Sequence, residues 1–563
     1  MSAIAPPRPL LAPRPLFCAI EHLHRDRGVA EDVLAGRFTH CGVTRTLGIE
    51  PDWLGAALPE DEEWRIEWVK FYYGLDLAHA CRETGDVAYR HAWERLVGSW
   101  LEQVPPDHDP SEVTARRIQN WLYAWDAFGE LRPPLAEAQL ASLAAQARHV
   151  RATLTPERNH RTLELYALFL LPLAFPELDE DGLLAFAVDA LRCDLRDAFH
   201  ADGVHREAST HYHLVALRTF VAARENAARY GLDLGRRYDE RLARACHFAG
   251  HVHRPDGRIP ALSDSDSGSY GELLALAGRL LGRHYEPPAR GNVSFPDGGY
   301  YLQRERDRFL VFDCGPLGDG GHGHYDLLSF EAYGAGRPLV VDPGRYTYSE
   351  HAPNFRRWFK GTAAHNTVCV DGLDQTPYRR GKPRGPVAEG RLLRRLSSPQ
   401  LDVLVGEARS PSYEAVHERT VAFVAGEYWL IEDRLRGNRP HRYDLRFHLA
   451  TEDAEVDGDT VRAPGLTLVI ASAARPRLEH GWVSERYGEK RPAAVVSAAV
   501  EARSARFVTL VVPGERQPSL QVRHTLFEIS LGSRLDRLAL TPVSARWERR
   551  QDGIRIGEQE ART

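Results

Sequence analysis

The feature that most constrains the fold is a change in hydrophobic periodicity near Pro287. Before it, apolar side chains recur every three to four residues, and after it β-branched and aromatic runs alternate with Gly, Asp and Asn turns. The first pattern is typical of amphipathic helices, and the second of antiparallel strands. A chain of 563 residues is also too long for one ordinary core. The sequence therefore predicts a multidomain α + β protein.

The helical part is expected to span residues 60–286, where apolar stripes such as Tyr89, Trp93 and Leu96 repeat. Roughly ten helices separated by short polar breaks must pack on one another. Residues 1–59 mix prolines with short apolar runs, and we expect an irregular lead-in there.

Residues 287–549 are expected to form an antiparallel β-sandwich, because many short strand-like runs follow one another at the spacing of such folds. Charged residues dominate 550–563, which predicts a frayed tail.

Composition excludes some classes of partner. Hydrophobic residues make up 43% and charged residues 27%, as in soluble globular proteins, and the formal net charge is -6. This charge offers no global attraction to nucleic acid or an anionic membrane. A polyanionic ligand would therefore need a local basic lining.

Seven cysteines form no CxxC pair, which indicates reduced thiols rather than a disulfide framework. The N-terminal residues contain prolines where a signal peptide needs an apolar run, and no stretch reaches membrane-spanning length. We expect a cytoplasmic protein, with a periplasmic or secreted location left open.

Polar residues suited to chemistry gather within residues 309–370. His324, Asp342 and His365 make a plausible zinc set, since two imidazoles and a carboxylate suit that ion and leave a fourth position free. Asp326 is an alternative ligand to Asp342, and each histidine could instead be an ordinary hydrogen-bonded residue. His322 lies two residues before His324, so both can face one groove, and the flanking glycines allow close approach.

Two motifs in the helical part also carry chemistry. Asn159 and His160, between two arginines, open a predicted helix, and helix starts favour anions such as a carboxylate. Asn159 could instead be a simple N-cap. Tyr212 lies between two histidines near another helix start, where a cationic neighbour would lower the pKa of its hydroxyl. The alternative for Tyr212 is a residue at the edge of the core.

Weaker candidates could line a groove for an acidic sugar. Arg117 and Trp121 offer a cation and an aromatic ring, although Trp121 also lies on an apolar stripe. Tyr346 and Arg356 are further groove candidates, and the turn at residues 264–267 could brace the site. Four others are Tyr348, Arg357, Tyr487 and Lys490.

Several of these segments together resemble a known family. The run from Gly320 to Phe330, the Val-Asp-Pro-Gly turn at 341–344, residues 354–359 and the Ala-His-Asn-Thr-Val run at 364–368 are similar to the C-terminal half of the heparinase II/III family. These are polysaccharide lyases that include alginate and oligoalginate lyases. The resemblance implies an N-terminal incomplete (α/α) toroid followed by a C-terminal antiparallel β-sandwich.

The resemblance also implies roles for individual residues. Asn159 and His160 match the motif that neutralises a uronate carboxyl group, and Tyr212 matches the catalytic tyrosine, supported by Glu207 and Ser209. Glu207 is also expected to contact the substrate. Zinc in such proteins braces the site and does not activate water, which we expect for His324, Asp342 and His365. The implied partner is an anionic polysaccharide or oligosaccharide.

A lyase acting on a 4-linked uronic acid removes the C5 proton, stabilises the resulting anion and protonates the leaving O4. Tyr212 and His322 can supply acid and base, and neutralising the carboxylate lowers the barrier. Syn elimination would let one tyrosine do both steps, and anti elimination would use His322 as the base.

Three other functions remain open. A uronate C5-epimerase would share the proton abstraction, and an inverting (α/α) glycoside hydrolase would need two carboxylates, for which Glu207 and Asp264 are the obvious pair. A glycan-binding protein of a polysaccharide cluster would keep the fold as a scaffold. The sequence leaves the sugar, endo or exo action and a possible homodimer undetermined.

Overall fold

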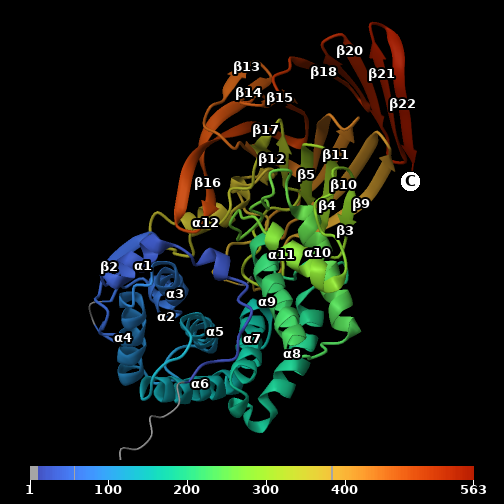
Figure 1. The fold of residues 1–563 in the computed structure, drawn as a ribbon. Coiled ribbons are helices and arrows are strands. Elements are labelled where there is room, and N and C mark those ends of the chain that lie inside the picture. Colours follow the sequence, from blue (N-terminus) through green and yellow to red (C-terminus); the bar gives the residue numbers. More distant parts are fainter. Residues whose placement is uncertain (1–10, 56–57, 382–383, 563) are drawn as a thin grey trace, which may run out of the picture. The chain divides into compact units, whose positions relative to one another are not determined.

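The computed structural model describes residues 11–55, 58–381 and 384–562 (Figure 1). The chain divides into two compact units. The first holds residues up to Ala198 together with Val215–Leu242, and the second holds Phe199–Leu214 and the chain from Ala243 onward. Helices dominate the first unit and antiparallel strands the second. No helix among the described residues is long and apolar enough to cross a membrane.

The first unit begins with regular structure where an irregular lead-in was expected. Asp26 caps a short helix by accepting hydrogen bonds from the amides of Gly28 and Val29, and a two-stranded hairpin follows. The prediction of an irregular 1–59 segment is therefore wrong for these residues. The elements are α1 (Arg27–Leu34), β1 (Arg37–His40), β2 (Val43–Thr46), α2 (Glu62–Val69), α3 (Tyr73–Thr84), α4 (Ala88–Gln103), α5 (Ser111–Phe128), α6 (Leu135–Ala152), α7 (Arg158–Ala174) and α8 (Leu183–Ala198).

Alternate helices of this unit pack on one another. Helix α3 contacts α1 and α5, and α5 contacts α7, while α4 contacts α6 and α8 packs on α7. An inner series and an outer series of helices result, which is the (α/α) toroid that the resemblance implied. The core between them is aromatic, with Trp64, Trp68, Trp93, Trp100 and Trp125 all fully buried.

The second unit begins with helical segments. Helix α9 (Thr210–Arg229) starts in it, and most of α10 (Arg236–Val252) and all of α11 (Gly271–Leu281) belong to it. A five-stranded antiparallel sheet follows in sequential order. Its strands are β3 (Val293–Phe295), β4 (Tyr300–Glu305), β5 (Arg308–Asp313), β6 (Phe330–Gly334) and β7 (Arg337–Val340).

A ten-stranded antiparallel sheet forms the middle layer. Its main path runs β13-β14-β15-β17-β12-β11-β10-β9, with β16 paired to β17 and β8 to β12. Helix α12 (Phe355–Lys360) precedes it in the chain. The strands are β8 (Val368–Val370), β9 (Glu389–Ser398), β10 (Leu401–Arg409), β11 (Val416–Val424), β12 (Tyr428–His448), β13 (Glu455–Asp457), β14 (Thr460–Ala463), β15 (Leu466–Ala471), β16 (Arg477–Arg486) and β17 (Glu489–Pro513).

Both faces of the middle sheet are buried. In β11, Val421 and Phe423 belong to the core shared with the first sheet, whereas Ala422 and Val424 belong to a second core shared with the C-terminal sheet. Successive side chains of a strand point to opposite faces. This explains why strands such as β11 and β17 have continuous apolar runs instead of an alternating pattern.

The C-terminal sheet extends to the end of the described chain. Strand β22 pairs with β21 in antiparallel register, and Ala561 is buried in the second core. The prediction of a frayed tail from residue 550 is therefore wrong. From Glu558 onward, the exposed charged side chains of this strand alternate with less exposed residues. The strands are β18 (Pro518–Arg523), β19 (Leu526–Leu531), β20 (Arg534–Leu540), β21 (Ser544–Gln551) and β22 (Ile554–Arg562).

A buried charge network ties the middle sheet to the loops beside it. Arg419 in β11 donates to the Asp433 carboxylate at 2.6 and 3.1 Å, to the Leu328 carbonyl at 2.7 Å and to the Asn366 carbonyl. His417 donates to the same carboxylate at 2.6 Å. Arg419 thus fixes two loop carbonyls from a position with no exposed surface.

Replacing Arg419 with Ala is expected to destabilise the second unit by about 3–5 kcal/mol, because it leaves the buried Asp433 carboxylate without its main counter-charge. Thermal and denaturant unfolding of the full chain would measure the loss. Arg546→Ala is the matched control, since Arg546 is 62% exposed in its ion pair with Glu558, and it should change stability by less than about 0.5 kcal/mol. Equal stability of the two variants would contradict this account.

Candidate active site

The site is built on a loop that follows β5 and carries two histidines. Gly323 separates them, and a Cβ there would lie 1.8 Å from the Leu317 carbonyl oxygen, so only glycine allows this close approach. The amide of His324 donates to the Ser263 hydroxyl at 3.3 Å, and the amide of Asp264 donates to the His322 carbonyl at 3.1 Å. The histidine loop is therefore joined to the segment around Asp264.

Asp264 is the common partner of both histidines. His322 Nδ1 donates to one carboxylate oxygen at 3.0 Å, and His324 Nε2 donates to the other at 2.8 Å. Arg356 spans both oxygens. Burial raises the pKa of Asp264, but Arg356 and the two histidines outweigh it and hold that pKa well below its usual range. The turn predicted to brace the site therefore supplies its central charge.

Tyr212 lies in the first turn of α9 and its ring stacks on His322, with centroids 3.8 Å apart. Ser209 accepts a hydrogen bond from the Tyr212 amide at 3.2 Å, which fixes the start of the helix. The Tyr212 hydroxyl lies 2.9 Å from the Tyr348 hydroxyl. The sequence placed Tyr212, Ser209 and His322 in one site, and within this unit they do lie together.

A chain of donors leads to the Tyr212 hydroxyl. Arg345 is held by Asp266 through hydrogen bonds of 2.8 and 2.6 Å, and it donates to the Tyr348 oxygen at 3.0 Å. Because the Tyr348 oxygen accepts from Arg345, its own hydrogen is available for Tyr212. Burial raises the pKa of Tyr212 to about 12, although Arg345 and the hydrogen bond from Tyr348 lower it. A cationic neighbour is present as expected, but its effect is smaller than that of burial.

Helix α12 holds the backbone next to His322. Arg356 and Lys360 lie one helical turn apart, and both donate to the Gly321 carbonyl, at 3.3 and 2.5 Å. Burial lowers the pKa of Lys360 to about 8. Asn354 caps the helix by accepting from the Arg357 amide at 2.8 Å. A short capped helix thus fixes the position of the histidine loop.

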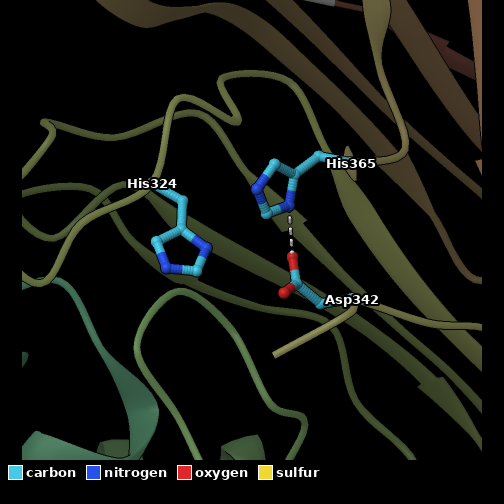
Figure 2. Close-up of side chains that lie close together, drawn as sticks. All are labelled: His324, Asp342 and His365. Carbon is cyan, nitrogen blue, oxygen red and sulfur yellow. Dashed lines mark hydrogen bonds and ion pairs between the residues drawn. The ribbon is translucent and has the colours of Figure 1, made fainter. Parts of the chain in front are cut away.

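His324, Asp342 and His365 form a candidate metal centre (Figure 2). Their ligand atoms lie within 4.8 Å of one another, and all three residues are buried. His365 Nδ1 lies 2.9 Å from an Asp342 oxygen, whereas Asp326 is 4.0 Å from the same nitrogen. The set proposed from the sequence therefore converges, and Asp342 is the better ligand.

The chemistry of these donors fits a divalent metal. Asp264 accepts a hydrogen bond from the Nε2–H group of His324. The opposite ring nitrogen, Nδ1, is buried with no hydrogen-bond partner among the described residues. Burial lowers the pKa of His324 to about 4, so its ring is neutral, as a ligand must be. Burial also lowers the pKa of His365, but Asp342 and Asp326 outweigh this and raise it to about 9. The pocket therefore favours a cation.

Three residues predicted to contact substrate have other partners in the structure. Glu207 is buried, and its carboxylate lies 3.5 Å from His322 Nε2. Arg356 is also buried, with its guanidinium committed to Asp264. The Tyr346 ring is half-buried, and the Lys490 ammonium lies 4.6 Å from its centroid. Glu207 and Arg356 hold other side chains of the site in place.

The prediction that Arg117 and Trp121 line a groove is wrong. Arg117 is fully buried in the first unit, where it donates to Asp109 at 2.6 Å and to Gln146 at 3.0 Å. Trp121 is also fully buried and packs edge-on against Trp100. Their apolar stripe faces the core between the two series of helices.

Asn159 and His160 lie in the first turn of α7, as the sequence predicted. Glu157 occupies the N-cap position, so the alternative that Asn159 is a simple N-cap is wrong. Asn159 is buried and His160 is exposed. Both belong to the first compact unit, and Tyr212 and His322 belong to the second.

Comparisons with known proteins agree with this architecture. Two family models match, heparinase II/III N-terminus over residues 25–276 and heparinase II/III-like, C-terminal, over residues 287–525. The heparin-sulfate lyase of Pedobacter heparinus is 24% identical over 512 residues, which cover 82% of this chain and 75% of that protein. The corresponding protein of Bacteroides stercoris is 22% identical over 545 residues, covering 84% and 79%.

Solved structures share the fold. A crystal structure of heparinase III has a TM-score of 0.76 at 17% identity, covering 98% of this chain and 92% of that chain. The heparan sulfate lyase of Pedobacter heparinus has a TM-score of 0.63 at 20% identity, covering 94% and 90%.

The helical toroid followed by stacked antiparallel sheets, together with the curated relatives, identifies the protein as a polysaccharide lyase. The two matched models together span most of the sequence, and the chain belongs to the heparinase II/III family.

Sequence reasoning missed two members of the site. Arg345 follows the Val-Asp-Pro-Gly turn, and Lys360 is the last residue of α12. Both look like surface cations in the sequence. The spacing of Arg356 and Lys360, four residues apart, is the one available signal that they share a helix face.

The full chain is expected to bind about one equivalent of a divalent metal, because the three ligands are preorganised and buried. Metal analysis of the purified protein would measure it. The double variant Asp342→Asn/His365→Ala should lose the metal and melt at a lower temperature. His351→Ala, which changes an exposed histidine, is the control and should retain it. Equal metal content in both variants would contradict the assignment.

Proposed function

We propose that this lyase cleaves a polysaccharide containing 4-linked uronic acid by β-elimination, giving an unsaturated uronate. The observation that carries the proposal is the stacked pair of Tyr212 and His322, in which a phenol hydroxyl and an imidazole lie side by side at one site. Such a pair supplies the acid and the base that elimination requires.

His322 takes the C5 proton, and Tyr212 donates a proton to the leaving O4. Tyr212 is suited to donation, because its pKa of about 12 keeps the hydroxyl protonated near neutral pH. The Tyr348 hydroxyl can donate to the Tyr212 oxygen, which stabilises the phenolate left after proton transfer. Asp264 orients the His322 ring through Nδ1.

Asn159 and His160 neutralise the substrate carboxylate. They open α7, where unpaired backbone amides and the helix dipole favour an anion. The carboxylate takes up the charge left by proton removal, so donors placed there lower the barrier most.

The substrate is a glycosaminoglycan of the heparan sulfate class. The two curated relatives named heparin-sulfate lyase support this choice over alginate.

The metal is zinc, held by His324, Asp342 and His365. When bound, it supplies a rigid cross-link between three loops rather than an activated water. His324 shares Asp264 with His322, so a fixed His324 also fixes the orientation of the acid/base group.

A glycoside hydrolase is disfavoured by the state of Asp264. An inverting hydrolase needs one carboxyl group that is protonated and one that activates water. Asp264 is fully buried, and Arg356 and two histidines occupy its oxygens. It therefore has no free oxygen for a water molecule.

Replacing Tyr212 with Phe is expected to lower turnover by about 100- to 10,000-fold, because the proton donor is lost while the stacked ring remains. The measurement is the rise in ultraviolet absorbance from the unsaturated uronate, with heparan sulfate, hyaluronan and alginate tested in parallel. Tyr230→Phe is the control, since that hydroxyl donates to the Pro15 carbonyl. Full activity of the Tyr212 variant would reject its role, and solvent hydrogen exchange at C5 without absorbance would indicate an epimerase.

Tyr348→Phe should reduce turnover more mildly, by about 3- to 10-fold, because it removes one hydrogen bond to the Tyr212 oxygen. The KM should change little, since this hydroxyl supports another residue. Steady-state kinetics on the best substrate would separate the two constants. A large rise in KM with unchanged kcat would instead make Tyr348 a substrate contact.

A further inference from the structure

A cleft outside the catalytic site lies between the middle sheet and the C-terminal sheet. It has a volume of about 230 Å³. Strands β9 to β12 line one side, and Thr525 and Leu540–Pro542 line the other. Leu396, Val403 and Val405 belong both to its lining and to the second core. The cleft is thus a place where the apolar layer between the two sheets gives way to polar side chains.

The strand register places the polar side chains of this cleft in one row. Arg394 lies opposite Val405, Val405 lies opposite Thr420, and Thr420 lies opposite Glu432. Directly opposed residues of antiparallel strands point to the same face. Glu418 and Arg434 oppose each other in the same way, two residues along the strands. These residues therefore lie side by side on one face of the sheet, across strands β9, β10, β11 and β12.

The lining of the cleft holds three arginines and two glutamates, which leaves one arginine in excess: Arg394, Arg434, Arg436, Glu418 and Glu432. Glu432 accepts from Arg434 at 2.9 Å and from Arg506 at 2.7 Å, and Glu418 lies 3.9 Å from Arg436. Both glutamates are therefore already neutralised. In the part of the chain that the structure describes, the Arg394 Nε is buried and has no hydrogen-bond partner. An unsatisfied buried donor beside paired carboxylates favours an anionic ligand.

We propose that this cleft binds a sulfate- or carboxylate-bearing sugar of an anionic polysaccharide, as a second glycan site of the enzyme. The Arg394 guanidinium takes the anionic group through its fork of donors. Leu396, Val403 and Leu540, which belong to the second core, form the apolar floor of the cleft. The inference rests on the proposed function for the class of polysaccharide.

A second site of this kind changes how long chains bind. When a long polymer binds in the cleft, the rest of the same chain is held near the catalytic site, which raises its effective concentration there. An oligosaccharide too short to reach both sites has no such advantage. The predicted role of the cleft is therefore to retain long substrates between turnovers.

The test uses the full chain carrying Tyr212→Phe, so that substrate is bound and not consumed. Titration calorimetry with a heparin oligosaccharide of defined length should show two classes of site. Adding Arg394→Gln should weaken one class by about tenfold or more, because a charge-assisted contact is lost. Arg394→Lys keeps the charge but loses the fork, and it should weaken that class by less.

Arg391→Gln is the matched control, since Arg391 lies on the same strand and is 66% exposed in its ion pair with Glu407. It should leave both classes unchanged, and a neutral glucan should not bind the cleft. A single class of site, or equal binding by the Arg394→Gln and Arg391→Gln variants, would overturn the proposal. Formation of unsaturated uronate by the wild-type enzyme tests the proposed function separately, so the two failures are distinguishable.

Discussion

The buried carboxylate of Asp264 is the interaction on which the rest of the site depends. Its two oxygens accept hydrogen bonds from His322, His324 and Arg356. Removing such a group from water is costly unless every lone pair is used, and here donors surround it. One anion therefore joins His322, the candidate metal ligand His324 and helix α12. The candidate metal centre is therefore joined to His322 through a single carboxylate.

The stacked sheets provide the rigid support that this arrangement needs. Arg419 reaches from β11 to the carbonyls of Leu328 and Asn366, which lie near Asp326 and His365 in the chain. Both faces of the middle sheet are covered by apolar cores, so its strands have little freedom to shift. The loops that carry the site are thus fixed at their ends by buried polar contacts.

The sequence predicted the parts of this protein that repeat or that carry rare residue combinations. Periodicity indicated the helical and sheet parts, and three residues picked out from the sequence, His324, Asp342 and His365, do converge in the structure. Prediction from the sequence failed where one pattern is compatible with two structures. An arginine and a tryptophan on a helical stripe suit a groove or a core equally well, and for Arg117 and Trp121 the core was correct. A charged C-terminal segment suits a tail or an edge strand, and β22 is a strand because β21 offers a free edge. The roles of Arg345 and Lys360 depend on contacts between loops distant in sequence.

The protonation of Tyr212 connects the fold to the direction of the reaction. A tyrosine with a pKa of about 12 holds its proton near neutral pH, as the proposed role of proton donor requires. The Tyr348 oxygen accepts a hydrogen bond from Arg345, and the Tyr348 hydrogen is then available for the Tyr212 oxygen. That donor cannot help Tyr212 to accept a proton, but it does stabilise the phenolate once the proton has left. The hydrogen-bond chain thus agrees with the proposed role of Tyr212 as proton donor, which assigns proton removal to the stacked imidazole of His322.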